Sequence, residues 1–479
     1  MNPLLLVDSY KIHHTKMYPD GMTKLYSNFT PRKSRMKGVD SVVVFGIQHF
    51  VLEYLIKQFN KEFFDKAEKP LLEEYQRHCQ VDVTHLKNLY DLGYLPIEIK
   101  ALEEGTLCPI GVPMMTITNT HPDFGWLVNY LETLISCMLW QPVTSATIAY
   151  EYKKILSKYA LETTGSVEGV QWQAHDFSMR GMSSVESATI SGMGHLTSFT
   201  GTDTIPAVYA LESSYNAEGL IGASVPATEH SVMCMGTKEA EVDTFRRLMK
   251  LYPTGILSVV SDTWNLWDVC TKFLPTLKDE ILARDGKLVI RPDSGDPVDI
   301  ICGEISNPDV KPTLADGYHP KHIGVIELLW NIFGGTINEQ GFKVLDPHIG
   351  AIYGDSITLE RATEICERLK AKGFASTNIV LGIGSFTYQY NTRDTFGFAM
   401  KATYGEVNGE GREIFKDPIT DDGTKKSKKG LLHVNKGLQV IDQVTWEEEK
   451  HGYLTTVFKD GKLVKETSLD DIRKRLTIN

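Results

Sequence analysis

The feature that most constrains the fold is a set of short apolar strands that each end in a carboxylate or a glycine. The stretch KLVIRPDSGDP (287–297) begins with three apolar residues and then delivers Arg291, Asp293 and Asp296. A buried strand with polar residues at its C-terminal tip is typical of an α/β barrel, which carries its chemistry at that end. The alternative is an ordinary turn, because Asp-Ser-Gly-Asp is also good turn chemistry.

The spacing of these tips favours a parallel barrel. Apolar runs end at Asp262, Asp293, Asp355 and Gly384, at intervals of 31, 62 and 29 residues. One βα unit takes about 30 residues, and the doubled interval coincides with an irregular insertion over 302–347. A Rossmann sheet is less favoured, because no GxGxxG follows the first strand. The pattern therefore predicts consecutive βα units with one functional face.

The parts of the chain before and after these units have a different pattern of predicted helices and strands. Residues 1–165 predict a mixed α+β domain, in which a long helical region over 124–159 is expected to break near Pro142. Residues 166–390 predict the barrel, which would be the catalytic domain. Residues 391–479 are rich in strands and end in a predicted hairpin and short helix that pack back on the first domain.

Composition excludes several classes of protein. The net charge of −11 argues against binding to nucleic acid. The N-terminal apolar run is too short for a signal peptide, and the apolar helix over 126–140 is interrupted by Asn129 and Glu132, so it is a core helix and not a membrane span. The seven cysteines form no metal-binding pattern and suit reduced thiols. We expect a cytoplasmic protein that contacts neither nucleic acid nor membrane.

The strand tips and nearby loops gather carboxylates, cations and glycines. The set comprises Asp203, Asp262, Asp293, Asp355, Arg180, Arg291, His230, Gly354 and Gly384. Carboxylates at one rim repel each other unless Mg²⁺ or ligand hydroxyls share them, while glycines let backbone amides approach a phosphate and arginines bind it through two nitrogens. The combination predicts a sugar-phosphate site. A metal-only hydrolase is less favoured, because HxH and HExxH are missing.

A series of motifs in fixed order carries a family resemblance over nearly the whole chain. The motifs are DSYK (8–11), FTPR (29–32), HDF and RG (175–181), GTDT (201–204), EHS (229–231), VVSD (259–262), IRPDSGDP (290–297), GD (354–355), TRD (392–394), FKDP (415–418) and SKKG (427–430). The chain resembles the nicotinamide phosphoribosyltransferase family, which are type II phosphoribosyltransferases.

The resemblance implies both a reaction and an architecture. The reaction is condensation of nicotinamide with phosphoribosyl pyrophosphate, which gives nicotinamide mononucleotide and pyrophosphate in NAD salvage. The architecture is an irregular, TIM-like parallel α/β barrel, flanked by a mixed α+β, β-rich domain that both chain ends build. The resemblance also implies a head-to-tail homodimer with two active sites at the interface.

The resemblance assigns residues to the base and the ribose. Phe177 and Tyr10 of the partner subunit would stack on the pyridine ring, although two ordinary core aromatics are the alternative. Asp203 would accept a hydrogen bond from the carboxamide, and Arg291 would face the amide oxygen. The ribose would be held by Asp293, Gly354 and Asp355.

The resemblance also assigns the phosphate and metal sites. Asp262 and Asp293 would lie near Mg²⁺ and pyrophosphate, and Gly384 would offer its amide to the 5′-phosphate. Positive charge develops on C1 of the ribose, so these carboxylates and Mg²⁺ would stabilise the transition state. The basic positions around the phosphates would be Arg32, Arg180, Lys416 and Lys425, with Arg393 and Lys401 from across the dimer. The chain departs from the expected family pattern at Met179, Gly350, Ser385, Phe386 and Ala399.

His230 resembles the histidine that family members phosphorylate with ATP, which couples ATP hydrolysis to synthesis. A lone histidine near a helix start is more often structural. Its place between Glu229 and Ser231, within a matched motif, favours the functional role.

Two other functions fit the same motifs. Nicotinate phosphoribosyltransferase performs the same chemistry on the acid, but a carboxylate at Asp203 would repel the carboxylate of nicotinate, whereas it suits a neutral amide. A catalytically silent binding or signalling protein on this scaffold would have no need of Asp262, Asp293 and His230 together.

Overall fold

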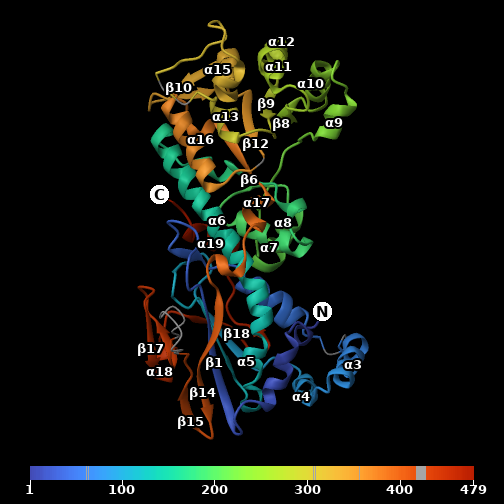
Figure 1. Ribbon diagram of the computed structural model, residues 1–479, viewed down its shortest axis with the longest axis vertical. Helices are drawn as coiled ribbons and strands as arrows, with labels where there is room; N and C mark the ends of the chain where they lie inside the picture. The colour runs from blue at the N-terminus through green and yellow to red at the C-terminus, as the bar shows by residue number, and fades with distance from the viewer. Residues whose placement is uncertain are drawn as a thin grey trace. The chain divides into compact units, whose positions relative to one another are not determined.

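The computed structural model describes residues 1–60, 62, 64–305, 307, 309–354, 356–416 and 428–478 (Figure 1). The chain divides into two compact units, each made of separate segments. Unit 1 comprises Met1–Thr147, Ala210–Ala217 and Asn391–Leu476, and unit 2 comprises Ile148–Tyr209, Glu218–Tyr390 and Thr477–Asn479. Both chain ends therefore contribute to unit 1, and the predicted barrel region makes up most of unit 2.

Unit 2 contains a six-stranded sheet in the order β7-β6-β13-β12-β9-β8. All of its neighbouring strands are parallel. Its strands are rich in buried β-branched and aliphatic residues, as expected where both faces of a sheet are covered. The bounds are β6 (Ala174–Asp176), β7 (Gly201–Thr202), β8 (Thr254–Val260), β9 (Asp285–Arg291), β12 (Ile349–Tyr353) and β13 (Ile379–Ile383).

The two edges of this sheet are joined by a segment that is not a regular strand. Ala223 forms a parallel bridge with Gly201 of β7, and Ala227 forms one with Ser258 of β8. The N–H of Thr202 donates to the carbonyl oxygen of Ala223 at 3.0 Å. The curled sheet thus surrounds an interior cavity of about 490 Å³. The predicted irregular parallel α/β barrel is confirmed.

The helices of unit 2 follow the strands that they connect. In α16 (Leu359–Ala371), the side chains of Ala362, Ile365, Cys366 and Leu369 are buried at helical spacing, so one face packs inward. The hydroxyl of Thr358 caps this helix by accepting from the N–H of Arg361 at 3.2 Å. The other helices are α7 (Val185–Leu196), α9 (His230–Met235), α10 (Glu241–Leu251), α11 (Leu266–Asp268), α12 (Leu274–Leu282), α13 (Pro297–Cys302), α14 (Pro320–Ile323), α15 (Val325–Phe333) and α17 (Ser385–Gln389), with the short segments η6 (Val170–Trp172), η7 (Met179–Gly181), η8 (Val269–Phe273) and η9 (Ser376–Asn378).

The insertion over 302–347 contains more structure than its sequence indicated. Besides the predicted helix near its middle, it holds a two-stranded hairpin of β10 (Gly335–Ile337) and β11 (Lys343–Leu345). These strands are three residues long and lack an alternating apolar pattern, so they left no periodic signal.

The expected helix break at Pro142 is wrong. Helix α6 (Glu132–Thr164) continues through this proline, which costs a helix about 3 kcal/mol. The flanking residues Leu139 and Val143 are fully buried, and packing of this kind offsets the cost. The boundary between the units falls at 147/148, inside α6, whereas the sequence-based boundary at 165/166 follows its end. Helix α8 (Ile205–Tyr215) likewise passes from one unit into the other.

Unit 1 is built on a seven-stranded antiparallel sheet in the order β15-β14-β1-β5-β3-β18-β19. The three central strands come from the N-terminal part of the chain, and the outer strands come from the C-terminal part. The bounds are β1 (Met22–Thr30), β3 (Ile97–Ala101), β5 (Met115–Asn119), β14 (Ala399–Val407), β15 (Glu410–Glu413), β18 (Thr455–Lys459) and β19 (Lys462–Leu463). The predicted β-rich domain formed by both chain ends is present.

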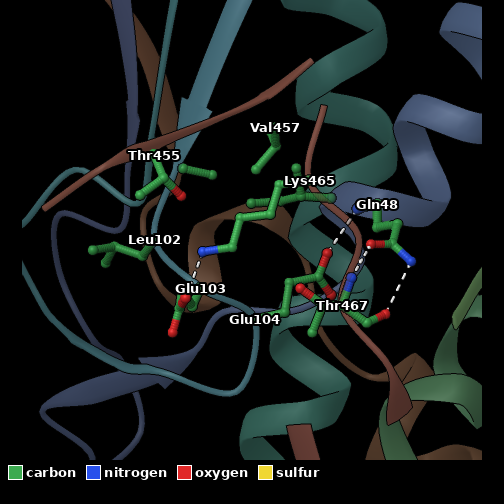
Figure 2. A pocket seen from close by; sticks show the side chains of 10 residues that line it. Gln48, Leu102, Glu103, Glu104, Thr455, Val457, Lys465 and Thr467 are labelled. Carbon is green, nitrogen blue, oxygen red and sulfur yellow. Dashed lines mark hydrogen bonds and ion pairs between the residues drawn. The ribbon is translucent and has the colours of Figure 1, made fainter. Parts of the chain in front are cut away.

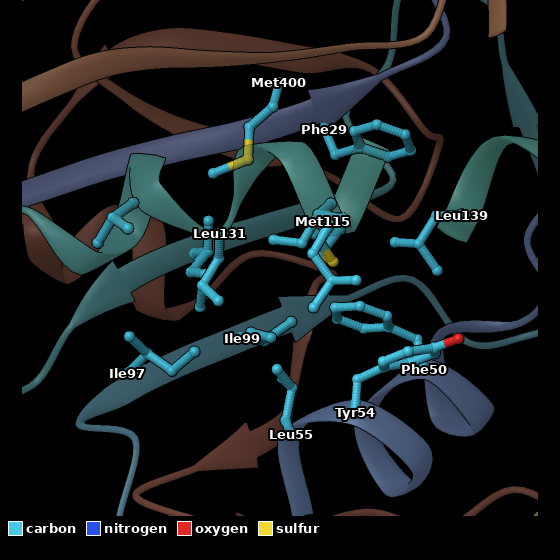
Figure 3. Close-up of a cluster of buried hydrophobic side chains, with 14 of the residues drawn as sticks. Phe29, Phe50, Tyr54, Leu55, Ile97, Ile99, Met115, Leu131, Leu139 and Met400 are labelled. Atoms are coloured by element: carbon cyan, nitrogen blue, oxygen red, sulfur yellow. The ribbon is translucent and has the colours of Figure 1, made fainter. Parts of the chain in front are cut away.

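The core of unit 1 combines side chains from both parts of the chain (Figure 3). Phe29, Ile99 and Met115 come from the central strands, and Met400 comes from β14. Around this core lie β2 (Ser41–Val43), β4 (Leu107–Pro109), β16 (Leu431–Val434), β17 (Val440–Val444), α1 (Ile47–Phe50), α3 (Lys69–Cys79), α4 (Thr84–Leu92), α5 (Leu127–Tyr130), α18 (Trp446–Lys450) and α19 (Leu469–Arg475), with η1 (Pro3–Leu5), η2 (Ser9–Lys16), η3 (Val51–Lys57), η4 (Phe64–Glu68), η5 (Pro122–Phe124) and η10 (Arg393–Thr395).

Polar contacts fasten the C-terminal tail to the N-terminal part of unit 1 (Figure 2). Lys465 forms an ion pair with Glu103. The side chain of Gln48 exchanges two hydrogen bonds with the backbone of Thr467, at 2.7 and 3.0 Å. The predicted terminal hairpin and short helix are present as β18, β19 and α19, and they belong to the same unit as residues 1–147.

In the part of the chain that the structure describes, no helix combines the length and the apolar character that crossing a bilayer requires.

Candidate active site

The C-terminal ends of the parallel strands in unit 2 bring seven of the predicted site residues to one end of the barrel. Phe177 follows β6, Asp203 follows β7, Asp262 follows β8, Arg291 ends β9, Asp293 follows it, Gly354 follows β12, and Gly384 follows β13. The predicted residue Asp355 lies outside the described residues. What these residues bind remains a prediction, but the strands that carry them are neighbours.

Phe177 lines the barrel cavity, beside a guanidinium group and an imidazole ring. The guanidinium carbon of Arg291 is 5.7 Å from the centre of its ring, and the imidazole of His175 is 4.5 Å away, centre to centre. The cavity lining includes both His175 and Phe177. An aromatic face in the lining of a cavity of this size can hold one planar ring.

Gly382 makes room for the ring of Phe177, and Gly354 is at ordinary contact distance from it. A Cβ on Gly382 would lie 2.6 Å from its Cδ2, and a Cβ on Gly354 would lie 3.6 Å from its Cε2. The Gly354 Cβ would also approach Asp293 Oδ1 within 3.0 Å. Glycine at 354 therefore leaves room for the Asp293 carboxylate.

Asp203 is a half-exposed carboxylate held by two donors. His175 Nε2 lies 3.1 Å from its Oδ1, and the hydroxyl of Ser224 donates to the same oxygen. Burial raises the pKa of Asp203, but the hydrogen bonds from His175 and Ser224 and the charge of Arg291 outweigh it, so the pKa is lowered. Asp203 is therefore an ionised acceptor at neutral pH, and its partner His175 also lies 4.5 Å from the ring of Phe177, centre to centre.

Arg291 has an unused donor inside the site. Its Nε is buried and has no hydrogen-bond partner among the residues that the structure describes. Buried donors are almost always satisfied. A ligand oxygen beside Phe177 would satisfy this one.

Asp262 fixes the loop that carries Asp293. Its Oδ2 accepts from the N–H of Asp293 at 2.9 Å and from the hydroxyl of Ser294 at 2.6 Å. Its Oδ1 is buried and without a partner within the described residues. Asp262 thus offers one free carboxylate oxygen beside a second carboxylate.

Asp296, the other carboxylate of the opening motif, has a structural task. It caps helix α13 by accepting from the N–H groups of Val298 and Asp299, at 2.9 and 3.2 Å. In this motif Asp296 therefore has the structural role, whereas Asp293 is the predicted site residue.

His230 is the first residue of α9 and is exposed. Its Nδ1 lies 3.2 Å from the hydroxyl oxygen of Thr263, the residue after Asp262. This contact brings the histidine to the same loop as the Asp262 carboxylate.

Gly384 and Arg180 lie close together at the β13 end of the rim. Gly384 precedes α17 with ordinary extended angles, φ −89° and ψ 178°, and a Cβ there would meet nothing within 4 Å. A Cβ on Gly181 would collide with the Ser385 hydroxyl, so η7, which carries the exposed Arg180, packs directly on the start of α17. The open backbone at Gly384 and this arginine could meet one phosphate.

The other predicted cations lie in unit 1, where four of them form a basic cluster. Burial and the charges of Arg32, Lys416 and Arg393 lower the pKa of Lys401, against the opposing charge of Glu132. The predicted residue Lys425 lies outside the described residues.

Tyr10 and Arg393 share a second pocket in unit 1, of about 290 Å³. The tyrosine side chain is 58% exposed, and the Lys11 ammonium lies 5.5 Å from its ring centre. An aromatic ring left this open is available to a ligand or to another chain.

The donor set at Asp262 and Asp293 fits Mg²⁺ that is shared with a substrate. No group of three or more His, Cys, Asp or Glu side chains within the described residues could hold a metal ion. Mg²⁺ is usually bound by one or two carboxylates together with phosphate oxygens and water, so a complete protein cage is not required. The buried free oxygen of Asp262 is suited to such a site.

Three contacts of the site were missed in the sequence. His175 and Ser224 hold Asp203, and Thr263 contacts His230. His175 lies within the HDF motif, which was a usable signal. Ser224 and Thr263 lie outside the motifs, and their partners are 21 and 33 residues away along the chain, so these two contacts left no signal in the sequence.

The fold of this chain is shared by two solved structures over nearly their whole length. The structure aligns with a nicotinate-nucleotide pyrophosphorylase from Pyrococcus furiosus at a TM-score of 0.56, covering 99% of this chain and 94% of that one, with 15% identity. It also aligns with human nicotinic acid phosphoribosyltransferase at a TM-score of 0.53, covering 98% and 92%, again with 15% identity. At this identity the likeness concerns the fold alone.

Sequence comparison defines the family to which the chain belongs. Residues 172–462 match the nicotinate phosphoribosyltransferase (NAPRTase) family, and residues 2–99 match the nicotinamide phosphoribosyltransferase N-terminal domain. A nicotinamide phosphoribosyltransferase of Acinetobacter baylyi is 50% identical over 99% of this chain and 97% of its own length. The chain belongs to the nicotinamide phosphoribosyltransferase family and is an enzyme, a pentosyltransferase.

Proposed function

We propose that the protein transfers the phosphoribosyl group of phosphoribosyl pyrophosphate to nicotinamide, as a step of NAD salvage. In this reaction the bond between C1 of the ribose and the pyrophosphate oxygen breaks, and a bond between C1 and the pyridine nitrogen forms. The observation that carries the proposal is the pair of Phe177 and His175 in the lining of the barrel cavity, with the Asp203 carboxylate 3.1 Å from His175 Nε2.

The base site suits a neutral amide. The ring of nicotinamide would stack on Phe177, its amide N–H would donate to Asp203, and its amide oxygen would accept from the unused Nε of Arg291. Nicotinate would instead place a second carboxylate against Asp203, which is repulsive. The same argument favours nicotinamide over nicotinate as the substrate.

The carboxylates at the rim suit the charge that develops in the reaction. Asp293, with Gly354 beside it, would hold the ribose and face the positive charge on C1. Asp262 and Asp293 would hold Mg²⁺, which supplies stabilisation of the departing pyrophosphate when it is bound. Asp262 also fixes the Asp293 loop by two hydrogen bonds, so the second carboxylate is placed before substrate arrives.

The phosphates need cations from more than one place. Gly384 and Arg180 would bind the 5′-phosphate in unit 2. The basic cluster of unit 1, with Arg32, Lys401 and Lys416 among its members, would contribute to a site of the partner subunit in a homodimer. Tyr10 would stack there on the second face of the base, which accounts for its exposure.

His230 would accept a phosphoryl group from ATP. Phosphorylation adds negative charge that can recruit Mg²⁺ and Arg180 and stabilise the pyrophosphate product site. The exposed position of His230 beside the Asp262 loop supports this role. ATP would then increase synthesis without being required for it.

The cytoplasm is the proposed compartment. Burial raises the pKa of Cys108, Cys270, Cys302 and Cys366 to about 12, so these thiols are unreactive core residues that need no oxidising environment.

One assay tests the reaction. Product formation is measured with nicotinamide, nicotinate and quinolinate side by side, each with phosphoribosyl pyrophosphate and Mg²⁺, and each with and without ATP. We expect turnover with nicotinamide, much less with nicotinate and none with quinolinate. Turnover that favours nicotinate would replace this proposal by the nicotinate enzyme, and no turnover at all would favour the silent binding protein.

A second assay tests His230. The His230→Ala variant should keep weak synthesis with Mg²⁺ but lose ATP hydrolysis, stimulation by ATP and acid-labile incorporation of labelled phosphate. His319→Ala is the matched control, because this histidine is also exposed in unit 2 and should leave all four quantities unchanged. If His230→Ala still incorporates phosphate and is still stimulated, the phosphorylated residue is another one.

A further inference from the structure

A fully buried carboxylate, Asp176, lies beneath the tips of β6 and β7 and has no part in the site described so far. Its Oδ1 accepts from the N–H and the hydroxyl of Ser178, at 2.9 and 2.6 Å. Its Oδ2 accepts from the hydroxyls of Thr204 and Thr202, at 2.7 and 3.3 Å. The side chain has no exposed surface, and no cation forms an ion pair with it in the described part of the chain. Four donors therefore replace a counter-ion.

These hydrogen bonds link the two loops that carry the base-site residues. Phe177 lies between Asp176 and Ser178, and Asp203 lies between Thr202 and Thr204. The N–H of Asp203 also donates to the carbonyl oxygen of Asp176 at 3.0 Å. One residue thus fixes the backbone on both sides of the aromatic ring and on both sides of the acceptor carboxylate.

The surroundings of Asp176 are neutral and tightly packed. A Cβ on Gly192 of α7 would lie 3.2 Å from its Oδ2, so the helix approaches the carboxylate closely. His195 Nε2 donates to the carbonyl oxygen of Gly201 at 3.0 Å, and its Nδ1 lies 2.7 Å from the hydroxyl oxygen of Tyr388. Burial lowers the pKa of His195 to about 4, so its imidazole is uncharged at neutral pH. The carboxylate therefore depends on its hydroxyl and N–H donors.

We propose that Asp176 is a positioning residue for base recognition. Its carboxylate sets the distance between the β6 and β7 tips, so that the ring of Phe177 and the carboxylate of Asp203 face the same base. The inference deepens the proposed function and rests on it, because it takes the base-binding roles of Phe177 and Asp203 from there.

A matched pair of variants at Thr204 tests the inference. Thr204→Val keeps the size of the side chain but removes the donor to Asp176, and Thr204→Ser keeps the donor. Thr204→Val should raise the KM for nicotinamide about tenfold or more, reduce the preference for nicotinamide over nicotinate, and leave the KM for phosphoribosyl pyrophosphate within about twofold. Thr204→Ser should keep most of the wild-type preference for nicotinamide. Asp176→Asn should change the same quantities further in the same direction.

Thr163→Val separates positioning from stability. Thr163 is also fully buried in unit 2, where its hydroxyl accepts from the N–H of Ser376 at 3.1 Å and donates to the carbonyl oxygen of Tyr159 at 2.7 Å. Its loss should lower the melting temperature without changing the preference between bases. If Thr204→Val and Asp176→Asn behave like Thr163→Val, or raise both KM values alike, the positioning role is wrong. If Asp176→Asn does not fold, the Thr204 pair decides.

The failure of this inference differs from the failure of the proposed function. Wild type and Asp203→Asn are measured with both bases in the same series. If wild type does not use nicotinamide, the proposed function fails and the positioning role fails with it. If wild type uses nicotinamide but Asp203→Asn leaves the KM for nicotinamide unchanged, the reaction stands, and the roles of Asp203 and Asp176 in base recognition both fail. A normal response of Asp203→Asn together with an unresponsive Thr204→Val rejects the positioning role alone.

Discussion

At the scale of single residues, the proposed function assigns the choice of substrate to the charge of one side chain, Asp203. Asp203 remains ionised because His175 and Ser224 donate to it. A carboxylate that is already half satisfied can still accept from an amide, whereas it cannot accept from another carboxylate. Under this proposal, the negative charge of Asp203 would select between two bases that differ in one group.

The first prediction follows for Asp203→Asn. Removing the charge should cost about 1.5–3 kcal/mol of binding for nicotinamide, as expected for a hydrogen bond to a charged group, and should relax the repulsion of nicotinate. The ratio of kcat/KM for the two bases should shift toward nicotinate. An unchanged ratio would show that another residue selects the base.

His195 gives a prediction about pH and stability. Its folded-state pKa of about 4 lies below the usual 6.5 because it is buried. The unfolded chain takes up a proton as the pH falls below 6.5, while the folded chain does not, so the free energy of unfolding should fall between these two values by up to about 1.4 kcal/mol per pH unit. Above 6.5 this contribution is fully present.

Urea unfolding at a series of pH values checks this. His195→Gln should show a shallower decline over the acid range than wild type, because one linked proton is lost. The exposed His319→Gln should decline as wild type does. Equal slopes for all three proteins would mean that His195 does not carry the linkage.

At the scale of elements, two glycines of unit 2 have very different surroundings. Gly384 has ordinary angles and open space for a Cβ. In contrast, a Cβ on Gly286 of β9 would lie 2.0 Å from the carbonyl oxygen of Gly255, which is backbone of the neighbouring strand. The same substitution should therefore have different consequences at the two sites.

Gly384→Ala should leave the melting temperature unchanged but raise the KM for phosphoribosyl pyrophosphate several-fold, because a methyl group would block the approach of the phosphate. Gly286→Ala should destabilise the barrel by more than about 2 kcal/mol, because the β8 and β9 pair must separate to admit it. Denaturation curves and steady-state kinetics measure both. A Gly384→Ala enzyme with normal kinetics would remove this glycine from the phosphate site.

The elements that the sequence could predict are those with a local signal. The buried strands β8, β9, β12 and β13 are runs of apolar residues with polar tips at regular intervals. The segment that joins the barrel edges, 223–227, has no such run and contains Pro226, so its bridging role depends on strands that are distant in the sequence. Pro142 shows the opposite failure, in which a strong local signal was overridden by burial on both sides.

The same distinction between local and distant signals applies to the site. The strand tips that carry Asp262, Asp293 and Gly384 follow from apolar runs alone. The contacts that tune them, such as His175 with Asp203, depend on how strands pair in space. The pairing of strands from the two chain ends in unit 1 has no local signal at all, since β1 and β14 bring Asn28 and Lys401 together across 373 residues of chain.

At the scale of the whole molecule, the predicted site residues are divided between the two units. Phe177 and Asp293 belong to unit 2, and Tyr10 and Arg393 belong to unit 1. In the proposed head-to-tail homodimer, each site takes the first pair from one subunit and the second pair from its partner. The proposal predicts that two different defects complement each other.

Mixing inactive Tyr10→Ala and inactive Asp293→Ala proteins should restore activity. With random exchange, half of the dimers are hybrids and each hybrid has one intact site, so about a quarter of wild-type activity is expected. A chain that carries both substitutions, mixed with either single variant, is the negative control. No rescue, with hybrid dimers verified by mass, would show that sites are not shared.

The order of strands in the unit 1 sheet has a consequence for synthesis of the chain. Strands β1, β5 and β3 are complete once residue 119 has been made, but β14, which covers one open edge, begins only at residue 399. At about 5–20 residues per second, this edge stays uncovered for roughly 15–60 s. The edge at β3 waits longer, for β18. During that time the nascent chain carries unpaired strand edges that another chain could extend. Nascent chains held close together during synthesis are therefore at risk of aggregation through these edges, which are paired in the finished structure.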